Sequence, residues 1–152
     1  MRANMPTSSI RVLGTSTLSP LSLALPMVGM RAACGFPSPA EDFMGEDLDL
    51  TKRCISNPAA TFFAEVEGES MIAFGIYPGD TLVLDRSISA KDDDIALLLW
   101  DGGLTVKKLR MRRNAVELVS GDSQHPPILV TGESELQVWG VVTWSFRKHL
   151  RR

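Results

Sequence analysis

Short stretches in which apolar and polar positions alternate follow one another after Pro58, and they predict a series of β-strands. Alternation from Phe62 to Val66 is typical of a half-buried strand that ends at Gly68. A continuous apolar run at residues 95–100 indicates a central strand, and Asp101-Gly102-Gly103 predicts a tight hairpin turn after it. Further strands are predicted at residues 81–84, 104–111, 116–119, 128–130 and 136–146. This spacing predicts a mostly β fold, built as compact twisted sheets or a partial barrel.

The first third of the chain has a different pattern. Residues 40–56 carry an imperfect apolar stripe that Pro58 ends, so they are the best helical candidate. Residues 1–34 are rich in Pro, Ser and Thr and show no helical period, which predicts an extended, mobile arm. We therefore expect an arm at 1–34 and a β-rich core at 35–152. A moderately apolar run at 18–30 leaves open an exported protein with a cleaved signal, although its prolines and serines favour the arm.

Composition narrows the possible functions. The chain has 152 residues, 44% hydrophobic and 22% charged, which is an ordinary globular composition. A net charge of −2 argues against a whole-surface affinity for nucleic acid. Two cysteines, Cys34 and Cys54, make no disulfide framework and fit a reducing, cytoplasmic setting, while a single bridge between them stays open. The sequence contains no run of eighteen apolar residues, so no membrane span is predicted. We expect no metal and no cofactor.

Two charged stretches have structural interpretations. The basic cluster that begins at Lys108 and ends at Arg113 is interpreted as a solvated strand edge that resists association between sheets. Asp92-Asp93-Asp94 is interpreted as a solvated turn, because a metal site needs further converging ligands.

Ser70 stands in the motif Gly68-Glu69-Ser70-Met71 and is the candidate nucleophile. A serine hydroxyl attacks a carbonyl only when a base and oxyanion donors lie beside it. Gly68 permits a tight turn, so the backbone amides of Ser70 and Met71 could form that oxyanion hole. The alternative is a turn serine that caps a short helix begun at Met71. The two histidines, His125 and His149, lie in no recognisable triad context, which leaves a lysine as the best available base.

Lys107 is the candidate base. In a strand it shares one face with Thr105, Leu109 and Met111. Burial among apolar groups disfavours the charged amine, so the pKa of Lys107 should fall and make neutral amine available. The alternative is an amphipathic lysine that extends from a half-buried strand to solvent.

Four short motifs, taken in order, resemble the UmuD-type members of the LexA-type self-cleaving serine peptidases. They are Cys34-Gly35-Phe36-Pro37-Ser38-Pro39-Ala40, Gly68-Glu69-Ser70-Met71-Ile72, Pro78-Gly79-Asp80 and Thr105-Val106-Lys107-Lys108-Leu109. The similarity runs from about Cys34 to Val142. Glu69 stands where Asp is expected, and Ala73-Phe74 replaces a more polar pair, but neither change touches the proposed chemistry.

The resemblance implies a function. Ser70 would be the nucleophile, Lys107 the general base, and the bond between Cys34 and Gly35 the one that is cut. Members of this family cleave themselves on a RecA filament bound to single-stranded DNA. The trimmed homodimer then joins the Y-family polymerase UmuC.

Two other functions are disfavoured by the sequence. The segment ahead of Gly35 lacks the helical periodicity of a DNA-binding helix-turn-helix, which disfavours a repressor. A signal-peptidase relative is disfavoured because no membrane anchor is apparent. A non-catalytic interaction module with the same fold remains the alternative function.

Overall fold

The computed structural model describes residues 10–15, 24–28, 44–132, 135–150 and 152. The chain divides into two compact units, residues 18–56 and a larger unit that combines 1–17 with 57–152. In the described part of the chain, no helix is long and apolar enough to cross a membrane.

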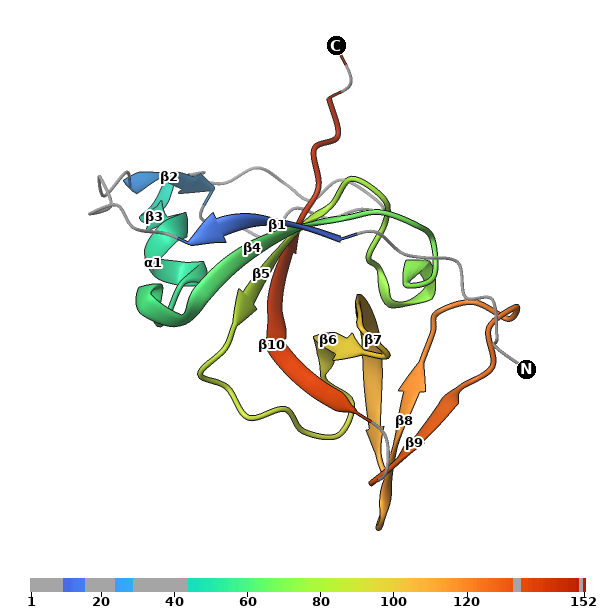
Figure 1. The fold of residues 1–152 in the computed structure, drawn as a ribbon. Coiled ribbons are helices and arrows are strands. Elements are labelled where there is room, and N and C mark those ends of the chain that lie inside the picture. Colours follow the sequence, from blue (N-terminus) through green and yellow to red (C-terminus); the bar gives the residue numbers. More distant parts are fainter. Residues whose placement is uncertain (1–9, 16–23, 29–43, 133–134, 151) are drawn as a thin grey trace. The chain divides into compact units, whose positions relative to one another are not determined.

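The larger unit is built on one antiparallel sheet, which confirms the mostly β prediction (Figure 1). The order of its strands is β1-β4-β5-β10-β6-β7-β8-β9. Their bounds are β1 Ile10–Thr15, β4 Thr61–Val66, β5 Thr81–Asp85, β6 Ile95–Trp100, β7 Gly103–Met111, β8 Ala115–Val119, β9 Ile128–Thr131 and β10 Leu136–Phe146. Each predicted strand after Pro58 is present to within two residues at either end.

The long strand β10 bends the sheet. Its first half pairs with β6 and its second half with β5, so one strand joins both parts of the sheet. The pairing slips by one residue between Val138 and Gly140 and again between Val142 and Trp144. Such bulges increase the local twist of a strand, and Figure 1 shows β10 as a curved ribbon. The result is a strongly curled sheet.

Two apolar clusters fill the larger unit. One contains Leu82, Leu84 and Leu97, which are fully buried, together with Met71. The other contains Leu98, Leu109 and Leu118, also fully buried. Neighbouring residues of β6 therefore contribute to different clusters, because successive side chains of a strand point to opposite faces.

The predicted hairpin turn between β6 and β7 is confirmed. Asp101 has φ 49° and Gly102 has φ 74°, both in the left-handed region. Two such residues in succession define a type I′ turn, whose twist matches that of the flanking strands. Trp100 on β6 pairs with Gly103 on β7 at its base.

In the smaller unit, the prediction of a helix over residues 40–56 is wrong for most of its described length. Residues Met44–Asp49 form strand β3, which pairs with β2 (Ala24–Val28), and α1 covers only Leu50–Cys54. The Asp49 carboxylate accepts a hydrogen bond from the Lys52 amide at 3.1 Å and caps the first turn of α1. Strand pairing with a distant segment decided the conformation here, so the imperfect apolar stripe wrongly indicated a helix.

The sequence predicts an extended, mobile arm at 1–34. Two of its segments, β1 and β2, are extended and paired, β1 with β4 and β2 with β3. Residues 1–9, 16–23 and 29–34 lie outside the described residues, so the mobility of the arm stays a prediction.

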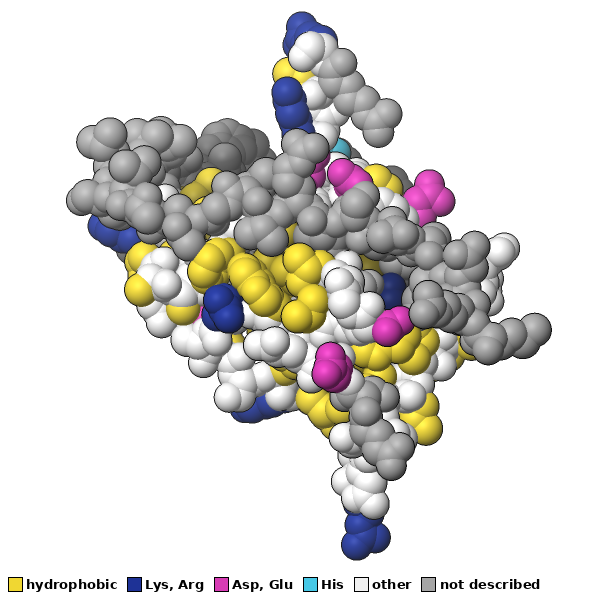
Figure 2. Space-filling view, viewed as in Figure 1, with side chains coloured by type: hydrophobic (Ala, Val, Ile, Leu, Met, Phe, Trp, Pro, Cys, Tyr) yellow, Lys and Arg dark blue, Asp and Glu magenta, His cyan; other side chains and the backbone are white. Residues whose placement is uncertain are grey.

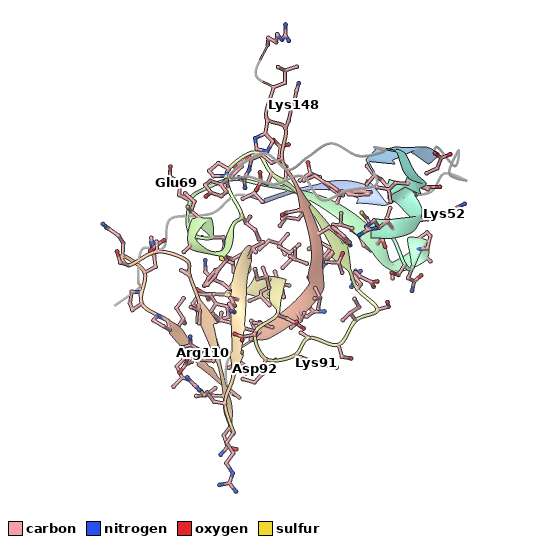
Figure 3. All side chains as sticks on the ribbon, turned by 180° about the vertical axis from the view of Figure 1, so that it is seen from behind. Lys52, Glu69, Lys91, Asp92, Arg110 and Lys148 are labelled. Atoms are coloured by element: carbon pink, nitrogen blue, oxygen red, sulfur yellow. The ribbon has the colours of Figure 1, made fainter. Side chains whose placement is uncertain are left out.

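The interpretation of the basic cluster as a strand edge is wrong. The strand that carries its first part, β7, lies between β6 and β8, and three of its four basic side chains form ion pairs. Arg110 and Arg112 bind Glu117 on β8 at 3.2 and 3.0 Å, and Lys108 binds Asp93 at 2.9 Å. Figure 3 labels Arg110 of this cluster, together with Asp92, in the lower part of its view. On the face drawn in Figure 2, Lys and Arg gather at the C-terminal tail and at the tip between β7 and β8.

Candidate active site

Ser70 lies in the connection between β4 and β5. Gly68 has φ 89°, in the left-handed region that favours glycine, so the chain turns sharply just before the serine. A short 3-10 helix, Ile72–Phe74, follows, and Gly75 (φ 80°) ends it. Met71 is 3% exposed and belongs to the apolar core, whereas Glu69 points away from the core (Figure 3). The core therefore anchors the residue next to the serine.

Lys107 reaches this serine from β7. Its Nζ lies 3.3 Å from the Ser70 Oγ, within hydrogen-bonding distance. The lysine is only 5% exposed, which is unusual for this residue type. Its partner on β6 is Ala96, and Leu109 lies two positions further on the same face; both are fully buried. Met111, which was also expected to flank the lysine, is 37% exposed, so it contributes little to this apolar surrounding.

This burial changes the proton affinity of the amine. Loss of hydration lowers the pKa of Lys107 from its ordinary value of 10.5, and the charge of Asp122 partly opposes that change. A lysine with a lowered pKa holds more neutral amine near neutral pH, and neutral amine can accept the proton of a serine hydroxyl. The pair thus has the composition and spacing of a nucleophile and its base.

Gly121, after β8, holds the backbone of residues 68–76, the serine segment. Its amide donates to the Ser70 carbonyl, and its own carbonyl accepts from the Ala73 amide at 3.2 Å. A Cβ at this position would lie 3.1 Å from the Ala73 nitrogen and 3.2 Å from the Met71 carbonyl carbon. Only glycine fits here without displacing that backbone, and no motif in the sequence marks this position.

The chain is similar to known proteins over most of its length. Residues 26–143 match the Peptidase S24-like family. The chain belongs to this family. Protein ImpA of Escherichia coli is 44% identical over 123 residues, 80% of this chain and 83% of its own length. Protein SamA of Salmonella typhimurium is 38% identical over 82% of this chain and 86% of its own, and Protein MucA of Escherichia coli is 35% identical over 83% and 86%.

Family membership confirms the resemblance that the four motifs indicated. The matched region extends from ahead of Cys34 to beyond Lys107, so it contains all four motifs of the S24-like chain. The proposed cleavage bond between Cys34 and Gly35 lies outside the described residues. Its position relative to Ser70 therefore remains a prediction.

Asp122 and His125 form a second polar pair beside the site of this S24-like chain. The His125 Nδ1 lies 2.7 Å from one Asp122 oxygen and 2.9 Å from the other. His125 lies in no recognisable triad context in the sequence, and this pair includes no serine. A spacing of three residues between an acid and a histidine is too common to have indicated the pair.

An ion pair stabilises the residues that follow the serine segment. Arg147, directly after β10, binds the buried Asp80 through two nitrogens at 2.7 Å each, and donates to the Gly75 carbonyl at 2.9 Å. Its guanidinium also stacks on the Tyr77 ring, 3.8 Å from the centroid. These hydrogen bonds from Arg147 hold the pKa of Asp80 below its ordinary value of 3.8. Residues 75–80, which lead into β5, are thereby fixed to the end of β10.

The backbone amides of the serine segment are mostly occupied. Those of residues 72–76 donate to carbonyls of Glu69, Gly121, Met71 and Ile72. The amides of Ser70 and Met71, predicted as oxyanion donors, are not among these. Within the described residues, no group of three or more His, Cys, Asp or Glu side chains could hold a metal ion.

Proposed function

We propose that this S24-like chain is a self-cleaving serine peptidase of SOS mutagenesis that cuts its own bond between Cys34 and Gly35. The observation that carries the proposal is the buried Lys107 amine 3.3 Å from the Ser70 hydroxyl. Membership of the Peptidase S24-like family supports it, because 118 matched positions, residues 26–143, include both the bond and the pair. No metal or cofactor takes part.

The chemistry follows from the two side chains. Neutral Lys107 removes the Ser70 proton while Oγ attacks the Cys34 carbonyl carbon, and the amides of Ser70 and Met71 stabilise the oxyanion. The bond to the Gly35 nitrogen breaks as the Lys107 ammonium donates to that nitrogen the proton it took from Ser70. Lys107 then activates a water that hydrolyses the acyl-enzyme and releases Ser70. Because the bond is tethered to the catalytic core, its effective concentration is high and a weakly activated pair suffices.

The partners belong to the same proposal. By its family, the chain acts in the cytoplasm as a homodimer. A RecA filament on single-stranded DNA stimulates the cut by favouring the cleavable pose of the arm. The product, residues 35–152, then serves a UmuC-like Y-family polymerase as accessory subunit.

The direct test is the intact mass of the full chain after incubation at neutral pH, with and without activated RecA filament. We expect RecA to convert the chain to a fragment that begins at Gly35, and a Ser70→Ala chain to keep its full mass. Unchanged mass with RecA present would favour the non-catalytic interaction module. Cleavage after Cys34 by the Ser70→Ala chain would equally refute the proposal.

The pH dependence of unassisted cleavage is a separate prediction. The base acts in its neutral form, so the rate should rise as pH passes upward through the lowered pKa of Lys107 and then level off. Because burial lowers that pKa, the plateau should be reached below the pH at which an ordinary lysine titrates. Initial rates from neutral to strongly alkaline pH, measured without RecA, check this. A flat profile would remove lysine from the role of base.

A further inference from the structure

The turn that carries Asp122 has a well-defined internal structure. One carboxylate oxygen of Asp122 accepts hydrogen bonds from the backbone amides of Gln124 at 3.0 Å and His125 at 2.8 Å. The His125 ring binds the same carboxylate. An aspartate that accepts from the amides of the next residues is a strong local determinant of a turn. Asp122 is therefore the residue on which the turn at 122–125 depends.

This turn is joined directly to the catalytic serine. Gly121, one residue before Asp122, exchanges backbone hydrogen bonds with Ser70 and Ala73. Gly121 also fits tightly against the Met71 backbone, where a Cβ would lie 3.2 Å away. A displacement of the turn therefore moves the Ser70 backbone as well, because the two segments are in direct backbone contact.

Asp122 also acts on Lys107 through its negative charge. Of the charged groups in the described residues, it is the one whose field raises the pKa of Lys107. The β6 neighbour of Lys107 is Ala96, and Lys108 faces the other way, where it binds Asp93. The hydrogen bond from His125 lowers the pKa of Asp122, so this carboxylate keeps its charge at neutral pH.

We propose that Asp122 is a positioning residue of the Ser70–Lys107 site, which holds the turn that fixes the serine backbone and also restrains the activation of Lys107 by its charge. The two effects are separable, because one needs the hydrogen-bond acceptor and the other needs the negative charge. The charge slows unassisted cleavage near neutral pH, which leaves more of the reaction under the control of a partner. This inference rests on the proposed function of the pair.

The test is the pH–rate profile of unassisted cleavage by the full-length Asp122→Asn chain. Asparagine keeps an oxygen that can accept from Gln124 and His125, but it carries no charge. We expect the midpoint of the profile to move to lower pH, so that cleavage is faster than wild type near neutral pH. The plateau rate should stay within about threefold of wild type because the serine remains in place.

Two further variants make the test specific. Asp101→Asn removes one carboxylate from the exposed β6–β7 turn and should leave the profile where it is. Asp122→Glu keeps the charge but lengthens the side chain, so we expect a lower plateau. Its midpoint should stay closer to wild type than that of Asp122→Asn.

The outcomes also separate this inference from the proposed function. With Ser70→Ala and Lys107→Met uncleaved, an unshifted midpoint in Asp122→Asn overturns the effect of the Asp122 charge, and a wild-type plateau in Asp122→Glu overturns its positioning role. An equal shift in Asp101→Asn would show a general effect of net charge and would also overturn it. Cleavage by Ser70→Ala would overturn the proposed function, and the inference with it.

Discussion

A Lys107→Met chain should remain at full mass under conditions in which the wild-type chain is converted to the fragment that begins at Gly35. Methionine fills the buried volume beside Ala96 and Leu109 without a charge, so the fold should be kept. It has no group that can take the Ser70 proton. Loss of a general base slows a reaction by between about a hundredfold and ten-thousandfold. Intact mass over a time course at alkaline pH measures the loss.

Lys108→Met is the matched control for this variant. Lys108 is the next residue of β7, so its side chain leaves the strand on the opposite face from Lys107. Its amine lies 2.9 Å from Asp93 and 5.2 Å from the centroid of the Phe74 ring, and it makes no hydrogen bond to Ser70 among the described contacts. Removing this partly exposed contact should leave cleavage within about threefold of wild type, because surface ion pairs contribute little. Comparable losses in the two variants would mean that β7 supports the site only as structure, and a Lys107→Met chain that still cleaves normally would exclude the dyad.

Gly121→Ala should slow self-cleavage by about 10- to 100-fold while the chain remains folded. The added Cβ would meet the Ala73 nitrogen at 3.1 Å and the Met71 carbonyl carbon at 3.2 Å, so the serine segment must shift. Both atoms belong to the backbone and cannot rotate away. Displacement of a reacting group by a fraction of an ångström is costly because attack requires close alignment. Plateau rates at high pH, where Lys107 is neutral in both chains, isolate this geometric effect.

The control for this variant is Gly132→Ala. An added Cβ there would meet nothing within 4 Å, so the same change of residue type should leave cleavage unaffected. Thermal unfolding of both variants separates a displaced serine from a loss of structure. If Gly121→Ala cleaves at the wild-type rate, the contact of Gly121 with the serine segment does not position the nucleophile.

Most strands of the sheet could be predicted from the sequence, because their signal is local. Alternation at 61–66, the apolar run at 95–100 and the turn at Asp101-Gly102 each specify their own conformation within a few residues. The segment 44–49 could not be predicted in this way. Its conformation depends on pairing with residues 24–28, which are about twenty positions away in the sequence. Pairing partners at that distance leave no local period to detect.

The candidate site divides along the same line. Ser70 and Lys107 were identifiable because a glycine turn and an apolar strand face are local patterns, and the order of four motifs indicated the family. Their contact at 3.3 Å is a property of the folded sheet. Gly121 and the Asp122–His125 pair carried no distinguishing pattern, because their importance comes only from the segment against which the fold places them.

By itself, the amino-acid sequence determined the β-rich class, the family and the two reactive side chains, since each rests on short-range patterns that survive without a fold. Tertiary structure alone decided how deeply Lys107 is buried and that the Gly121 backbone is hydrogen-bonded to Ser70. It also decided that the Asp122 carboxylate acts on Lys107. The physical reason is that hydration, steric fit and electrostatic fields depend on distances between atoms, and those distances exist only after the curled sheet has brought remote segments together.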